Sequence, residues 1–257
     1  MLLVIDIGNT NSVFAVFGDD DTVIAQWRLH SAAQRTADEY GLLCSQACTH
    51  HHIHIGDITD VIVASVVPDA QYPIMQFCTY YLNNISPVIV GKDALAMNIA
   101  VDVDHPEEVG ADRLVNAVEA WHKYKKGLLV LDFGTATTFD VVSSQGTYIG
   151  GVIAPGINLS LQALQQAAAK LPSVRVRQPK HIIGRNTVAA MESGIFYGYA
   201  ELICGIIKRI KEERSDIELV IATGGLASLY TKYINEIDEI SNELTLYGLK
   251  TLHRINT

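Results

Sequence analysis

The stretch that decides the fold is Asp132-Phe133-Gly134-Thr135-Ala136-Thr137-Thr138, at the end of an apolar run that begins at Gly127. A shorter version, Asp6-Ile7-Gly8-Asn9-Thr10, ends the apolar run that begins at Leu2. Each stretch contains a glycine and lies between two β-rich runs, which favours a turn between antiparallel strands. Because both stretches occupy the same place in two similar segments, the sequence predicts an internal duplication.

Around each of the two turns, the sequence predicts the same order of strands and helices. Three β-rich runs predict an antiparallel meander, and alternating helices and apolar strands follow, which is typical of helices that cover a sheet. The expected strands are Leu2–Ile7, Val13–Phe17, Val23–Leu29, Val61–Val67, Val88–Val90, Gly127–Asp132, Thr137–Val142, Thr147–Ile153, Glu218–Ala222 and Leu244–Leu246. The expected helices are Thr36–Cys48, Ala70–Leu82, Val109–Gly127, Asn158–Lys170, Thr187–Arg214 and Ala227–Ile234.

The expected division places residues 1–108 in an N-terminal half and residues 109–257 in a C-terminal half. No Pro/Ser-rich linker or low-complexity segment separates them. We therefore expect the two α/β halves to share a cleft.

The composition indicates a globular protein. The chain has 257 residues, of which 49% are hydrophobic and 18% charged. This composition excludes a chain that is intrinsically disordered as a whole. The net charge of -9 repels polyphosphate backbones, so nucleic acid is not an expected partner. No apolar run approaches the length of a membrane span, and no basic region precedes the N-terminal apolar stretch, so we expect a cytoplasmic protein without a membrane partner.

The four cysteines do not suggest a disulfide framework, because a chain of this size can build a core without covalent crosslinks. We expect them to be mostly small buried hydrophobic residues. A soft-metal site is an alternative at Cys44 and Cys48, since His50, His51, His52 and His54 follow closely.

The two turns carry residues suited to phosphate. A glycine allows close approach, backbone N–H groups and hydroxyls donate to phosphate oxygens, and an Asp can hold hydrated Mg²⁺. Two facing turns of this kind would grip a nucleotide from both sides, whereas a single one is an ordinary polar turn. The chain contains neither a P-loop nor a Gly-x-Gly-x-x-Gly fingerprint, so another phosphate-binding arrangement is needed.

Thr223-Gly224-Gly225 follows an apolar strand and precedes a predicted helix. Its glycines would let an adenosine lie against bare backbone, or they serve the strand-to-helix turn alone.

Val109-Gly110-Ala111-Asp112-Arg113 begins a predicted helix. The helix dipole and Arg113 favour an ionised Asp112, which could accept a hydroxyl proton, and Arg113 could bind a substrate carboxylate. The alternative is that Asp112 provides only favourable helix electrostatics.

Together these motifs resemble the type III pantothenate kinases, which make 4'-phosphopantothenate at the entry to coenzyme A synthesis. The resemblance spans nearly the whole chain, and the matching segments occur in the family's order: Asp6–Thr10, Val109–Arg113, Asp132–Thr138, Leu171-Pro172, Gly184–Thr187 and Thr223–Gly225. It implies a duplicated actin-like ATPase fold, related to ribonuclease H, with a nucleotide cleft between two α/β halves.

The resemblance also implies the roles of individual residues. We expect the ATP site to comprise Asp6, Ile7, Gly8, Asn9, Thr10, Thr135, Thr223, Gly224 and Gly225. The expected pantothenate site comprises Gly110, Ala111, Asp112, Arg113 and Thr187, with Asp112 as the catalytic proton acceptor. Asp6 would take part in Mg²⁺ binding, and Asp132 would hold a monovalent cation, K⁺ or NH₄⁺. Thr187 is also suited to capping the long helix that follows it.

The family further implies a homodimer, to which the helix with Gly194, Gly198 and Gly205 would contribute. The sequence departs from a common family pattern at Val103-Asp104-His105-Pro106, where many members have Tyr-Asp-Asn-Pro. Two other functions remain open from the residues: an actin-like kinase for a sugar or acid, and a catalytically idle relative that regulates transcription through a partner.

Overall fold

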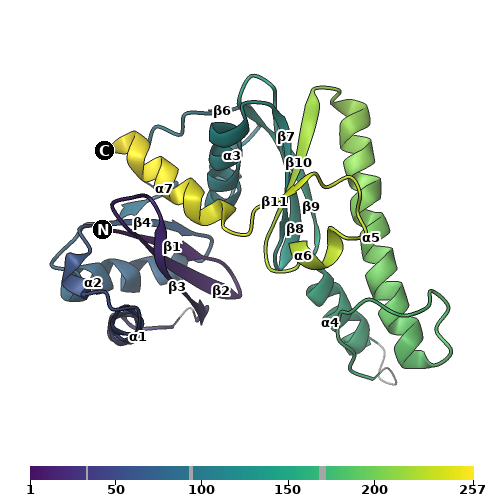
Figure 1. Ribbon diagram of the computed structural model, residues 1–257, viewed down its shortest axis with the longest axis horizontal. Helices are drawn as coiled ribbons and strands as arrows, with labels where there is room; N and C mark the ends of the chain where they lie inside the picture. Colours follow the sequence, from purple (N-terminus) through teal and green to yellow (C-terminus); the bar gives the residue numbers. More distant parts are fainter. Residues whose placement is uncertain (33, 93–94, 168–171) are drawn as a thin grey trace. The chain divides into compact units, whose positions relative to one another are not determined.

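The computed structural model describes residues 1–32, 34–92, 95–167 and 172–257, which form two compact units (Figure 1). Unit 1 comprises Met1–Ala100, Asp104–His122 and Glu243–Thr257, and unit 2 comprises Val101–Val103 and Lys123–Asn242. This division differs from the expected one at residue 108. Most of helix α3 (Ala111–Tyr124) and the whole of helix α7 (Leu244–Asn256) belong to unit 1, because their apolar side chains pack on the first sheet.

Unit 1 is built on a five-stranded sheet in the order β3-β2-β1-β4-β5. β1 pairs antiparallel with β2 and parallel with β4, so that Asp6 lies opposite Val13 on one side and Ala64 on the other. The five strands are β1 (Leu2–Ile7), β2 (Asn11–Phe17), β3 (Val23–His30), β4 (Asp60–Ser65) and β5 (Val88–Ile89).

Unit 2 repeats this topology. Its sheet has the order β11-β10-β7-β8-β9-β6, in which β7, β8 and β9 form the meander and β10 and β11 are the parallel strands beside β7. The six strands of this sheet are β6 (Ala100–Val101), of which Val101 belongs to unit 2, β7 (Gly127–Phe133), β8 (Ala136–Val142), β9 (Thr147–Pro155), β10 (Ile217–Thr223) and β11 (Glu239–Ile240). The order of the five core strands is the same in both units, which confirms the predicted duplication.

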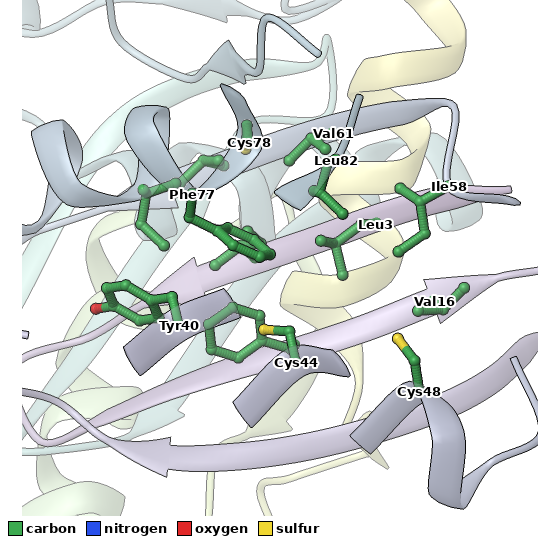
Figure 2. Packing of buried hydrophobic residues seen from close by; sticks show 14 of the residues in the cluster. Leu3, Val16, Tyr40, Cys44, Cys48, Ile58, Val61, Phe77, Cys78 and Leu82 are labelled. Carbon is green, nitrogen blue, oxygen red and sulfur yellow. The ribbon is translucent and has the colours of Figure 1, made fainter. Parts of the chain in front are cut away.

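Helices cover both faces of the first sheet. Leu3, Ile5 and Ile7 point into a core with α1 (Ala37–His50) and α2 (Gln71–Tyr81), whereas Val4 packs with α3 and α7 on the opposite face. Figure 2 shows Cys44, Cys48 and Cys78 among the packed side chains of the first core. The expectation that most cysteines are buried hydrophobic residues is confirmed, because only Cys204 is partly exposed.

In unit 2, the long helix α5 (Thr187–Glu213) runs alongside the sheet (Figure 1). The hydrophobic core of unit 2 also contains side chains from α4 (Ile157–Ala167) and α6 (Ala227–Tyr230). Among the described residues, no helix combines the length and apolar character needed to span a membrane.

One expected strand is wrong. Leu244–Leu246 alternates as a strand would, but these residues begin helix α7. The strand that corresponds to β5 of the first sheet is β11, which lies earlier in the chain. The helical spacing of the buried Leu244, Gly248 and Leu252 shows why α7 is a helix, since they form one stripe. A Cβ at Gly248 would lie 2.5 Å from the Val115 carbonyl oxygen, so α7 approaches α3 at a position where only glycine fits. Lys170 and Leu171, which belong to predicted features, lie outside the described residues.

Candidate functional site

The turn between β1 and β2 is tight and supported from below. The Gly8 N–H donates to the Asn11 carbonyl at 3.0 Å, and Asn9 and Thr10 are exposed at the tip. Ser31, just after β3, donates its N–H to the Thr10 carbonyl at 2.9 Å and its hydroxyl to the Gly8 carbonyl at 2.6 Å. The turn therefore presents a polar tip on a fixed backbone.

Asp6 lies on the face of the first sheet that α3 covers. Side chains alternate along a strand, so Asp6 shares this face with Val4. Val4 belongs to the same hydrophobic cluster as Val115 of α3, against which Ala111 also packs. The first turn of α3 and Asp6 are thus on one side of the sheet.

Asp112 stands in the first turn of α3, and its carboxylate folds back toward Gly110. A Cβ at Gly110 would lie 2.6 Å from Asp112 Oδ1, and the Arg113 N–H donates to the same oxygen at 2.8 Å. Both Asp112 and Arg113 are half-buried. A helix N-terminus favours an anionic carboxylate, so the local structure suits a proton acceptor.

The turn between β7 and β8 is the unit 2 counterpart. The Gly134 N–H donates to the Ala136 carbonyl at 3.1 Å. Gly156, just after β9, donates its N–H to the Thr135 carbonyl at 3.1 Å, as Ser31 does to Thr10 in unit 1. A Cβ at Gly156 would lie 2.3 Å from the Thr135 carbonyl oxygen, so this contact requires glycine.

Asp132 and Gly224 meet at the ends of two neighbouring strands. Asp132 of β7 pairs with Thr223, the last residue of β10. Gly224 has φ of 90°, and a Cβ there would lie 2.6 Å from Asp132 Oδ1. The carboxylate therefore lies against bare backbone, as expected if a small ligand is to approach both.

Thr187 is the first residue of α5. Asn186 caps this helix by accepting the Ala189 N–H at 2.9 Å, so the capping role considered for Thr187 belongs to its neighbour. A Cβ at Gly184 would lie 2.2 Å from the Ala190 nitrogen, which explains the glycine before the helix. Thr187 itself is exposed at the start of α5.

The predicted residues are divided between the two units. Unit 1 holds Asp6, Ile7, Gly8, Asn9, Thr10, Gly110, Ala111, Asp112 and Arg113, and unit 2 holds Asp132, Thr135, Thr187, Thr223, Gly224 and Gly225. The sequence analysis did not identify the supporting residues Ser31 and Gly156. Aligning the ends of the two meanders would have found both, since each follows a third strand.

Other features of the units lie away from these sets. One cavity of about 470 Å³ lies between α5 and Glu236, and another of about 430 Å³ lies beside α7 and Asp60. Over the described part of the chain, no group of three or more His, Cys, Asp or Glu side chains is arranged to hold a metal ion. Magnesium bound mainly by phosphate and water needs only one or two protein carboxylates, so Asp6 still suits such an ion.

Comparisons with known proteins identify close relatives. The chain matches the family profile described as type III pantothenate kinase over residues 2–209. A type III pantothenate kinase from Paramagnetospirillum magneticum is 52% identical over 258 residues, which cover 100% of this chain and 98% of that protein.

Solved structures show the same fold at low sequence identity. A protein from Campylobacter jejuni assigned to the Baf family of transcriptional activators aligns with a TM-score of 0.60 and 18% identity, covering 98% of this chain and 97% of that one. A ROK family glucokinase from Streptomyces griseus, solved with glucose and AMPPNP, aligns with a TM-score of 0.57 and 10% identity, covering 98% and 99%. These likenesses show the fold alone, and it is the expected duplicated actin-like ATPase fold.

Proposed function

The chain belongs to the type III pantothenate kinase family, and we infer on that premise that it transfers a phosphoryl group from ATP to the primary hydroxyl of pantothenate. The product is 4'-phosphopantothenate, the first intermediate committed to coenzyme A biosynthesis. The observation that carries the residue assignments is the repeated topology, which puts Asp6 and Asp132 near the end of the equivalent strand in each unit.

Asp112 is the proton acceptor in this proposal. Its position in the first turn of α3 keeps a carboxylate anionic, and the neighbouring Arg113 supplies a guanidinium for the carboxylate of pantothenate. The other residues of the pantothenate site are Gly110, Ala111 and Thr187. Catalysis of phosphoryl transfer depends mainly on positioning the reactants and stabilising the charge of the transition state, so one weak base at the acceptor hydroxyl is sufficient.

The two turns hold the nucleotide. ATP supplies the phosphoryl group, and bound Mg²⁺ neutralises part of its charge. The unit 1 turn contributes Asp6, Ile7, Gly8, Asn9 and Thr10, and unit 2 contributes Thr135, Thr223, Gly224 and Gly225. Asp6 suits Mg²⁺ because it is a carboxylate beside an open glycine turn. Asp132 suits K⁺ or NH₄⁺ because its carboxylate oxygen lies against the bare backbone of Gly224.

The active form in this proposal is a homodimer built through the face of α5. Gly194 and Gly198 are exposed on this helix, and among the described residues, the adjacent backbone of α5 apart, no atom lies within 4 Å of a Cβ at either position. Small residues at i and i+4 allow a second helix to approach closely. Sedimentation equilibrium should give a dimer, and Gly198→Glu should shift it toward monomer. A monomeric parent protein would contradict the dimer without affecting the reaction.

The reaction is tested by incubating the chain with ATP, Mg²⁺, K⁺ and pantothenate, followed by mass analysis. The expected product is pantothenate that is heavier by one phosphoryl group. Glucose in place of pantothenate serves as the acceptor control, and omission of K⁺ tests the cation. Phosphorylated glucose without phosphorylated pantothenate would assign the chain to sugar phosphorylation instead.

A further inference from the structure

Two buried tyrosines occupy the core of unit 2 side by side. Tyr199 of α5 is 7% exposed, and Tyr230 of α6 is fully buried. Their ring centroids lie 5.2 Å apart, and both rings also contact Phe133, the last residue of β7. The two phenols therefore share one apolar environment beneath the β7–β8 turn.

The two hydroxyl groups differ in their partners. Tyr230 Oη has no hydrogen-bond partner among the described residues. Tyr199 Oη shares a hydrogen bond with Thr137 Oγ1 of β8, in which either hydroxyl can be the donor. Ile157, the first residue of α4, belongs to the same hydrophobic cluster as the Tyr199 ring. Burial raises the pKa of Tyr199, so the phenol remains neutral near neutral pH and keeps its proton for this network.

These contacts of Tyr199 reach both sides of the turn that carries Thr135. Thr137 is fully buried and lies two residues beyond Thr135 on β8. Ile157 directly follows Gly156, whose N–H holds the Thr135 carbonyl at 3.1 Å. Tyr199 thus contacts both sides of the turn, through a hydrogen bond to the outgoing strand and through the hydrophobic cluster that contains Ile157.

Tyr199 also connects this turn to the pantothenate side of unit 2. It lies on α5, the helix that Thr187 begins, at a distance of about 18 Å along the helix axis. A helix is stiff over that length, so the phenol fixes the start of α5 relative to the β7–β8 turn. The segment before α5 is itself held to the helix by the Arg177 Nε to Glu192 Oε1 contact at 2.8 Å.

We propose that Tyr199 is a positioning residue for phosphoryl transfer, which sets the β7–β8 turn and the start of α5 for joint binding of ATP and pantothenate. The inference rests on the proposed function, since the turn must bind ATP and α5 must border pantothenate. In this proposal Tyr199 acts through its hydrogen bond to Thr137 and its packing with Ile157, and it touches neither substrate itself.

The test compares Tyr199→Phe with Tyr230→Phe, which removes the same atom from a neighbouring ring. Tyr199→Phe leaves the buried Thr137 hydroxyl without its hydrogen-bond partner, so the KM for ATP should rise about tenfold while kcat changes less than about threefold. Tyr230→Phe removes a hydroxyl that makes no hydrogen bond, so its KM and kcat should match the parent chain. Equal KM values for the two variants would overturn the proposal.

Thr137→Val removes the other hydroxyl of the same hydrogen bond. It tests the proposal independently if Tyr199→Phe folds poorly. It should also raise the KM for ATP, and the double variant should be less than additive because both changes break one interaction. Full additivity would contradict a shared network. Binding of ATP measured with and without saturating pantothenate should show weaker coupling in Tyr199→Phe than in Tyr230→Phe.

The controls separate this proposal from the function itself. A parent chain that forms no phosphopantothenate would refute the proposed function. An active parent chain whose kinetics are unchanged by Tyr199→Phe and Thr137→Val would refute only the positioning role. A loss of activity that follows the fraction of unfolded chain in thermal melts, with KM unchanged, would also refute it.

Discussion

Replacement of Gly224 by alanine tests whether the end of β10 must lie bare against Asp132. Gly224 has φ of 90°, a region that costs a residue with a Cβ about 1–2 kcal/mol. The new Cβ would also lie 2.6 Å from Asp132 Oδ1, 2.7 Å from the Phe133 nitrogen and 2.8 Å from the Phe133 carbonyl carbon. Two of these atoms belong to the backbone of β7, so relief requires the paired strand ends to separate.

Overpacking of this kind adds about 1–3 kcal/mol. We therefore expect Gly224→Ala to lower the free energy of unfolding by about 2–5 kcal/mol. The matched control is Gly225→Ala, since among the described residues, its chain neighbours apart, no atom lies within 4 Å of a Cβ at Gly225, and its φ is not positive. This control should change the free energy of unfolding by less than about 0.5 kcal/mol.

Urea unfolding followed by circular dichroism measures both variants against the parent chain, with the slope of the free energy against urea as a check that the same surface is exposed. Isothermal titration calorimetry with ATP then measures the affinity of each variant for the nucleotide. Gly224→Ala should weaken ATP binding together with stability. If Gly224→Ala is as stable as Gly225→Ala, the close approach of β10 to Asp132 is not a constraint and the reasoning fails.

Three further predictions concern catalysis, pH and the thiols. Asp112→Asn should lower kcat by about 10²–10⁴ with an unchanged KM for ATP, because the amide oxygen can still accept the Arg113 N–H; near-normal kcat would remove Asp112 from the role of base. The pKa of Asp216 is held far below its usual range, first by Arg214 at 2.9 Å and then by the Ser144 N–H, so its stabilisation is present above the unfolded-state pKa and is lost as the pH falls. Asp216→Asn should accordingly destabilise by about 1 kcal/mol near pH 7 and by less near pH 3, and an equal loss at both pH values would contradict the ion pair. Burial raises the pKa of Cys204 to about 11, so a thiol reagent near pH 8 should label this half-buried residue slowly and the three buried cysteines only after unfolding; rapid labelling of the native chain would disagree.

The sequence predicted the strands best where alternation and glycine turns act locally. Leu2–Ile7 is observed with the predicted bounds, and the second meander starts at Gly127 as expected. The helix at the C-terminus was missed because Leu244 and Leu246 alternate like a strand, while the helix depends on packing against α3. That packing joins segments far apart in the chain, so the alternation of Leu244 and Leu246 alone could not decide between strand and helix.

For the candidate site, too, the sequence predicted the residues of local motifs but not their partners from distant parts of the chain. The Asp and Gly of each turn are visible in the sequence because their chemistry lies within a few residues. Tyr199 is not visible in this way, since it lies 62 residues from its partner Thr137. Ser31, 23 residues from Gly8, is found only when the ends of the two meanders are aligned. Gly110 and Gly224 could be noted from sequence, but only the structure shows that each accommodates a neighbouring carboxylate.

The central proposal is that the equivalent turns of the two duplicated units, which follow Asp6 and Asp132, bind a single nucleotide. A crystal structure of the chain with a non-hydrolysable ATP analogue, Mg²⁺ and pantothenate tests it most directly. The account predicts the phosphates of one analogue within hydrogen-bonding distance of both the Gly8–Thr10 turn and the Gly134–Thr135 turn, with the pantothenate hydroxyl beside Asp112. An analogue bound by one turn alone, with the other turn remote from its phosphates, would contradict the account.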